Sequence, residues 1–126
     1  MGEKLIAVIS LSGCPLLIVV VSIFMLRFPQ DRNSGIGYRT GRSVKSDAAW
    51  YAAQAYFAKG AIISGVILTV LSAVVLTYFA KQDMSSDEFA VPVIVTSVVQ
   101  AAVIIAVIAA TEMFLARNFD SNGNPK

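Results

Sequence analysis

The chain has 126 residues, of which 56% are hydrophobic and only 14% charged, and its formal net charge is +2. This composition excludes an ordinary soluble domain, in which about 25% of residues are charged. One cysteine and no histidine exclude an internal disulfide and leave almost no ligands for zinc or copper. We therefore expect no metal, no other cofactor and no catalytic residue.

Three hydrophobic runs without charged residues make up most of the sequence: Leu5 to Leu26, Gly60 to Ala80 and Phe89 to Thr111. Each reaches the roughly 20 residues that a helix needs to cross the hydrocarbon core of a bilayer. The runs predict an all-α integral membrane protein, one membrane domain over residues 1–126, with spans at about 5–28, 57–80 and 89–115. No segment is long enough for a separate catalytic domain, so we do not expect an enzyme.

Lysine and arginine are unevenly distributed around these spans. Eight of the ten lie between the first two spans or after the third, and only Lys4 and Lys81 lie on the other side. In short loops an excess of Lys and Arg marks the cytoplasmic side. We expect the N-terminus outside, and the C-terminus and the loop 29–56 in the cytoplasm.

The first span contains a proline and several small residues. Pro15 cannot donate a hydrogen bond to the carbonyl of Leu11, so a bend is expected there. Ser10, Gly13 and Cys14 share one helix face and predict a notch that another helix could approach.

The segment before the second span begins as a loop and then favours a helix. Residues 28–37 are rich in turn formers, whereas Ser46 and Asp47 have the character of a helix start. The alanine-rich stretch 47–59 either lies flat in the membrane interface or extends the second span. We favour the extension, because no helix breaker precedes Gly60.

The later spans carry polar residues at helical spacing. Gly60, Ser64, Gly65 and Ser72 predict a close helix contact on the second span. An acidic loop follows, with Ser86 to Glu88 as the expected cap of the third span. One face of the third span carries the polar residues Thr96, Ser97, Gln100 and Thr111. Glu112 follows at the inner end of the span, where we expect an interfacial acid. Gln100 either hydrogen-bonds a neighbouring helix or lines a polar path.

The basic loop could recognise an anion. Arg39 and Arg42 have planar forks suited to carboxylate or phosphate, and Ser43 and Ser46 can bind an anion or cap backbone groups. The alternative is a loop held by its own ion pairs, Arg39 with Asp47 or Arg42 with Glu112, together with contacts to anionic headgroups.

The same segment resembles the signature of the SdpI family of small bacterial membrane proteins. The resemblance covers about 30 residues and rests on Pro29, Asn33, Gly37, Tyr38, Arg39, Thr40, Ser43, Ser46, Trp50, Lys59 and Gly60. It implies a multi-pass protein of the bacterial inner (plasma) membrane in a short, three-span form. Longer members are similar to immunity proteins that protect a cell from its own secreted toxic peptide, or that signal by holding a repressor at the membrane.

Three functions follow as hypotheses. The first, implied by the resemblance, is tolerance to a membrane-active toxic peptide, or signalling of its presence to a cytoplasmic regulator. The second is a small oligomeric transporter or channel with Gln100, Thr96 and Ser97 facing inward. The third is an adaptor that binds anionic lipid or a soluble partner through Arg39, Arg42 and Lys45. Membrane lipid and a second copy of the chain are expected partners, and direct contact with nucleic acid is not.

Overall fold

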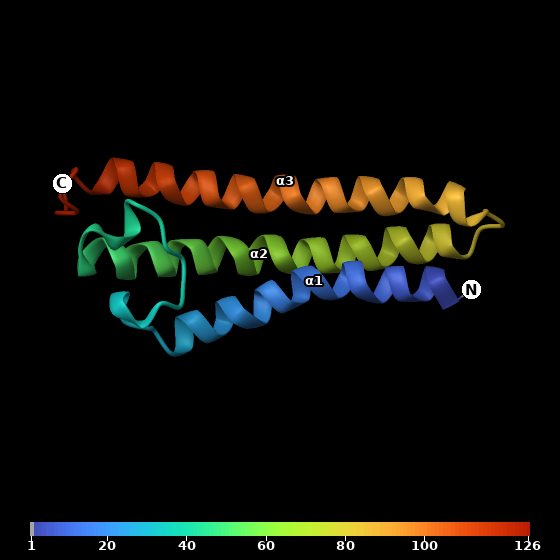
Figure 1. Cartoon of the computed structure of the whole chain (residues 1–126), viewed down its shortest axis with the longest axis horizontal. Helices are drawn as coiled ribbons and strands as arrows, with labels where there is room; N and C mark the ends of the chain where they lie inside the picture. Colours follow the sequence, from blue (N-terminus) through green and yellow to red (C-terminus); the bar gives the residue numbers. More distant parts are fainter. Residues whose placement is uncertain (1) are drawn as a thin grey trace.

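The computed structural model describes residues 2–126 and consists of three long helices joined by short connections (Figure 1). The elements are α1 (Gly2–Arg27), the single-turn 3-10 helices η1 (Arg32–Ser34) and η2 (Ser43–Lys45), α2 (Asp47–Ala80) and α3 (Ser86–Asn118). All three long helices are long and apolar enough to span a membrane. The prediction of an all-α protein with three spans is confirmed, and the expected spans lie inside these helices except for Phe28, which follows α1.

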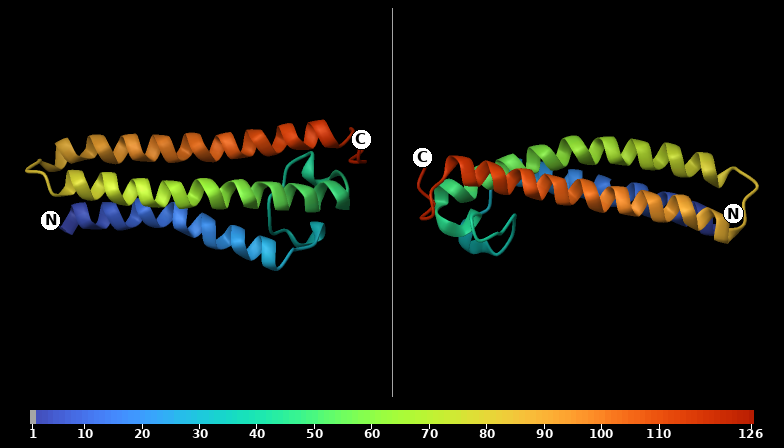
Figure 2. Two further views of the ribbon diagram at one scale, coloured as in Figure 1. Left: turned by 180° about the vertical axis from the view of Figure 1, so that it is seen from behind. Right: turned by 90° about the horizontal axis from the view of Figure 1, so that it is seen from above.

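Successive helices run antiparallel, with α2 between α1 and α3 in the view of Figure 1. Helix α2 packs against both neighbours, whereas α1 and α3 contact each other less extensively. The loop that carries η1 and η2 lies at the same end as the C-terminus, opposite the N-terminus and the turn between α2 and α3 (Figure 2). The basic loop and the acidic loop are therefore at opposite ends of the bundle.

Helix α2 is continuous from Asp47 to Ala80, so the stretch 47–59 extends the second span, as expected. Ser46 is its N-cap, since its hydroxyl accepts the amide hydrogen of Ala49 at 3.0 Å. The cap expected for α3, Ser86 to Glu88, is wrong by one residue. Ser85 is the N-cap, and its side chain and that of Glu88 form a reciprocal capping box, which requires the acid three residues after the cap.

The contact between α1 and α2 depends on a glycine. A side chain at Gly65 would place its Cβ 2.5 Å from Val19 and 3.1 Å from the carbonyl oxygen of Pro15. The buried stripe of α1 is Pro15, Val19 and Ser22, at i, i+4 and i+7. No helix of this chain packs into the predicted notch at Ser10, Gly13 and Cys14: Cys14 is exposed, and no atom lies within 4 Å of a Cβ built on Gly13.

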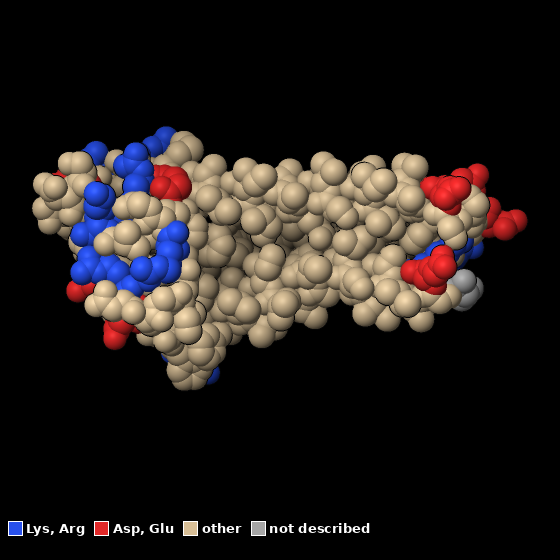
Figure 3. Space-filling model, in the orientation of Figure 1, with Lys and Arg blue, Asp and Glu red and all other residues tan. Residues whose placement is uncertain are grey.

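Charge separates along the bundle (Figure 3). Lys and Arg gather at the end with the basic loop, and Asp and Glu dominate the opposite end, while the long middle section has neither on this face. At the acidic end Lys4 fastens α1 to the turn, because its ammonium donates to the carbonyl of Met84 at 2.8 Å. The uncharged middle is the part that the hydrocarbon core would cover.

Candidate functional site

The segment around Tyr38 pairs with α2 through one buried side-chain amide. The backbone N–H of Tyr38 donates to Oε1 of Gln54, and Nε2 of Gln54 donates to the carbonyl of Tyr38, both at 2.7 Å. Gln54 is 6% exposed, so it satisfies both backbone groups of Tyr38 where water cannot. Sequence reasoning missed Gln54, although it is the only uncharged polar residue of the alanine-rich stretch.

Gly37 lets the loop approach α2 closely. Its φ of +122° lies in the region that favours glycine, and an added Cβ would lie 2.6 Å from Oε1 of Gln54 and 3.2 Å from the ring of Trp50. Trp50 is fully buried, and its indole N–H donates to the carbonyl of Gln30 at 2.8 Å. The spacing of Gly37, Trp50 and Gln54 therefore has a packing reason: the loop lies against one face of the first turns of α2.

Arg39 is exposed, but its guanidinium already has partners within the protein. Its guanidinium lies 5.4 Å from the centre of the Trp50 ring and donates to the carbonyl of Arg32. The expected pairing of Arg39 with Asp47 is wrong: Asp47 pairs with Arg32, whose Nε is 3.4 Å from its Oδ1. Arg32 also donates to the carbonyl of Val44. This bond holds η1 beside η2, so that Arg32, and not Arg39, lies next to Asp47.

Thr40 and Ser43 close a reciprocal turn between them. The amide of Thr40 donates to the hydroxyl of Ser43 at 2.8 Å, and the amide of Ser43 donates to the hydroxyl of Thr40 at 3.2 Å. The Ser43 hydroxyl also donates to the carbonyl of Tyr38, and the residue is fully buried. Ser43 therefore has a structural role in the loop and does not face a ligand. Asn33 lies exposed in η1, and no described residue hydrogen-bonds its side chain.

Tyr38 also joins the loop to α3. Its hydroxyl donates to Oε1 of Glu112 at 2.6 Å, and the other carboxylate oxygen lies 3.8 Å from Nε of Arg42, so the expected pairing of Arg42 with Glu112 is confirmed. Burial, and then the hydrogen bond to Glu112 and its charge, raise the pKa of Tyr38. Its ring stacks on Phe57 of α2 and packs in one cluster with Leu115 and Met25. One tyrosine thus connects the loop to all three helices.

The C-terminal tail folds back on the same loop, which sequence reasoning did not predict. The hydroxyl of Ser46 donates to the carbonyl of Gly123, and a Cβ on Gly123 would lie 2.7 Å from Lys45. Asp120 organises the tail, since its Oδ1 accepts the amides of Asn122 and Asn124 at 2.9 Å. These bonds, the Asn124 amide foremost, lower the pKa of Asp120. The turn-forming sequence of residues 120–124 was the available signal.

Inside the bundle, Gln100 joins all three helices. Its Nε2 donates to the carbonyl of Leu11 in α1 at 2.7 Å and to the hydroxyl of Ser72 in α2 at 2.9 Å. Ser97 is exposed and donates to the carbonyl of Val93 on its own helix. Thr96 lines a cavity between the middle parts of α2 and α3, Ser97 lines another cavity toward α1, and Gln100 borders both. The three polar residues of the channel hypothesis therefore do not face one common path within this chain.

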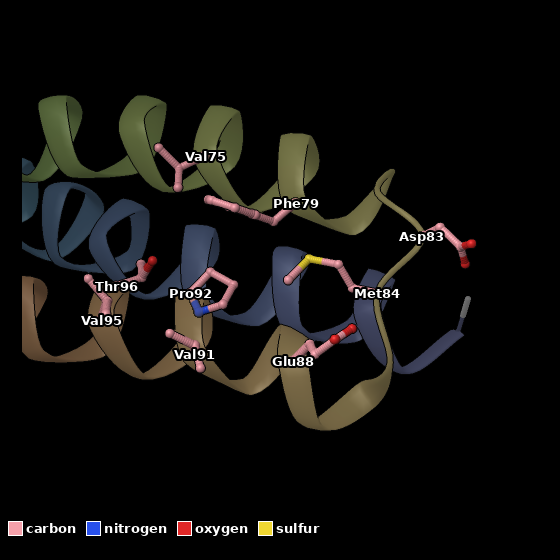
Figure 4. A pocket seen from close by; sticks show the side chains of 9 residues that line it. All are labelled: Val75, Phe79, Asp83, Met84, Glu88, Val91, Pro92, Val95 and Thr96. Atoms are coloured by element: carbon pink, nitrogen blue, oxygen red, sulfur yellow. The ribbon is translucent and has the colours of Figure 1, made fainter.

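A groove lies between α2 and α3 at the acidic end of the bundle, with a volume of about 640 Å³. Figure 4 shows Val75 and Phe79 of α2 facing Val91, Pro92 and Val95 of α3 across it. Asp83, Met84 and Glu88 lie at its outer end. The Glu88 carboxylate is held in the capping box, while Asp83 extends outward from the turn (Figure 4). The walls of the groove are therefore mostly apolar, with Thr96 at the inner end, and its mouth is acidic.

Comparison with known proteins gives one match. The model of the SdpI/YfhL protein family matches residues 30–111, which is more than half of the chain and includes the loop, α2 and most of α3. No curated protein and no solved structure matches.

Proposed function

Since the chain belongs to the SdpI/YfhL protein family, we propose that it gives its cell tolerance to a membrane-active toxic peptide or signals the presence of that peptide. The membrane-spanning helices and the family membership support this role. The single observation that carries it is the groove between α2 and α3, which opens at the acidic end of the bundle. Its apolar walls suit the hydrophobic side chains of such a peptide, and its acidic mouth suits basic ones.

The basic loop would act on the other side of the membrane. Eight of the ten Lys and Arg residues lie at that end, which favours the cytoplasm for the loop and the C-terminus and the outside for the groove. We infer the plasma membrane of a bacterium as the location. Most polar contacts of the loop are internal, as for Gln54 and Ser43, so the loop would be a rigid platform that a cytoplasmic regulator recognises.

A binding role is preferred over an enzymatic one. The chain has no histidine, and its closest acid and hydroxyl pair, Glu112 and Tyr38, is held inside the packed cluster. General acid–base catalysis needs a group that reaches a substrate atom with a pKa near the working pH. The raised pKa of Tyr38 moves that group away from this range.

Survival measurements test the proposal. Cells with and without the full-length chain are exposed to a series of membrane-active peptides that differ in net charge, and their killing curves are compared. The chain should protect against at least one hydrophobic, basic peptide. Phe79→Ala should weaken that protection, whereas Val74→Ala, which truncates an α2 side chain exposed outside the groove, should not. Identical killing curves with and without the chain would remove the proposal.

A further inference from the structure

The cations of the basic loop fall into two groups. Arg32 and Arg39 are occupied by Asp47, by the ring of Trp50 and by backbone carbonyls. Arg42 is different, since its only polar partner among residues 2–126 is Glu112 at 3.8 Å, beyond hydrogen-bonding distance. Lys45 is exposed, and no described residue pairs with its ammonium. These two cations remain available to a ligand.

Arg42 and Lys45 line the same cavity. It has a volume of about 460 Å³ and lies between η2, the last turns of α3 and the C-terminal tail. Leu115 and Phe119 supply its apolar surface, and Glu112 and Asp120 supply two carboxylates. Figure 3 shows acidic side chains among the basic ones at this end of the bundle. The cavity therefore combines two positive groups, two negative groups and an apolar wall.

The balance of charge selects the chemistry of the ligand. A site with two cations alone would attract any anion. Here the two carboxylates bring the net charge of the cavity lining to zero, so a simple anion gains little. The carboxylate of Asp120 is fixed by two backbone amides and its pKa is lowered, so it stays charged at neutral pH. A ligand that carries a negative and a positive group a few ångströms apart satisfies both kinds of side chain at once.

The position of the cavity identifies the source of such a ligand. It lies beside the end of α3 where Phe114 stacks on Tyr56 of α2, and aromatic side chains of this kind gather at the level of lipid headgroups. We propose that the cavity binds the phosphoethanolamine headgroup of a membrane lipid, with the phosphate at Arg42 and Lys45 and the ammonium at Asp120. Leu115 and Phe119 then contact the glycerol end of the lipid.

Native mass spectrometry of the purified full chain tests this assignment. The protein is equilibrated with equal amounts of phosphatidylethanolamine, phosphatidylcholine and phosphatidylglycerol of the same acyl chains, and the lipid retained is identified. Phosphatidylethanolamine should be retained in preference, about two- to fivefold, since its ammonium donates hydrogen bonds that the methylated choline lacks. Equal retention of phosphatidylglycerol would overturn the proposal, because positive charge alone would then explain binding.

Matched variants locate the site. Arg42→Gln combined with Lys45→Gln should abolish the preference, and Asp120→Asn should reduce retention of phosphatidylethanolamine to that of phosphatidylcholine. Lys59→Gln removes an exposed cation outside the cavity and should leave the preference unchanged. Fluorescence of Trp50 establishes that each variant is folded. A preference that survives both cavity variants would overturn the proposal.

A soluble competitor separates the two sources of this headgroup. Glycerophosphoethanolamine that displaces the lipid would indicate that the headgroup alone is recognised. Binding restricted to the intact lipid would indicate that the acyl chains on the surface of the bundle contribute. Both results support the site, and binding of neither molecule would remove it.

Discussion

The side-chain amide of Gln100 donates to the carbonyl of Leu11, the backbone group that Pro15 leaves without its helical partner, across 2.7 Å. The proline that bends α1 (Figure 1) thus exposes an acceptor, and α3 supplies the donor. In a membrane a carbonyl without a hydrogen-bond donor is costly. The hydrogen bond from Gln100 therefore compensates for the donor that Pro15 lacks.

Gln100→Leu should therefore destabilise the helix bundle by about 1 kcal/mol, the scale of hydrogen bonds between membrane helices. Unfolding in detergent with increasing denaturant measures the change. Ser97→Ala is the control, because that hydroxyl bonds only to its own helix. In a Pro15→Ala background Leu11 regains a helical donor, so the cost of Gln100→Leu should shrink. An unchanged cost would contradict the coupling.

Gly37→Ala should displace the loop from α2. Alanine at this position would have an unfavourable positive φ, and its Cβ would collide with Gln54 and Trp50. We expect a cost of about 1–3 kcal/mol in the free energy of unfolding. Trp50 is the only tryptophan, so its emission should shift to longer wavelength as the ring becomes hydrated. Gly41→Ala, for which no atom lies within 4 Å, should leave the emission unchanged, and equal spectra for the two variants would refute this packing.

The Tyr38 to Glu112 hydrogen bond predicts a dependence on alkaline pH. Because folding raises the pKa of Tyr38 above 10.0, the folded state favours the neutral phenol. Its contribution to stability is complete below the unfolded pKa and is lost as the pH rises through the folded one. Tyr38→Phe should lower stability at neutral pH by about 1 kcal/mol and should lack this alkaline loss. Tyrosinate absorbance should show that a titration at unusually high pH disappears in the variant.

The tail should open in acid. Since folding lowers the pKa of Asp120, its contribution is present above the unfolded pKa, near 4, and is lost as the pH falls through the folded value. Asp120→Ala should increase hydrogen exchange at the amides of Asn122 and Asn124 at neutral pH, as measured by NMR. Ser121→Ala changes an exposed neighbour and should not. Protected amides in Asp120→Ala would show that other contacts hold the tail.

Cysteine labelling tests the orientation. In a Cys14→Ala background, an impermeant maleimide added to intact cells should label Asp83→Cys and spare Gly41→Cys. Both positions are exposed and should react after lysis. The reverse pattern in intact cells would place the groove in the cytoplasm.

The helices could be predicted from sequence because their signal is local: long apolar runs define the spans, and Ser46 followed by Asp47 defines the start of α2. The contacts of the loop could not. Gln54 lies 16 residues from its partner Tyr38, and Gly123 lies 77 residues from Ser46, and nothing in the intervening sequence specifies such pairs. Charge alone predicts a pair between Arg39 and Asp47, whereas the fold pairs Asp47 with Arg32 and places Arg39 over the ring of Trp50.

Helix α2 has a mechanical consequence. Its 34 residues contain no proline and extend about 51 Å at 1.5 Å per residue, well beyond the ~30 Å thickness of the hydrocarbon. Phe79 in the groove and Trp50 under the loop thus belong to one continuous helix. A ligand that tilts this helix at one end would therefore also move its other end, at the opposite surface of the bilayer.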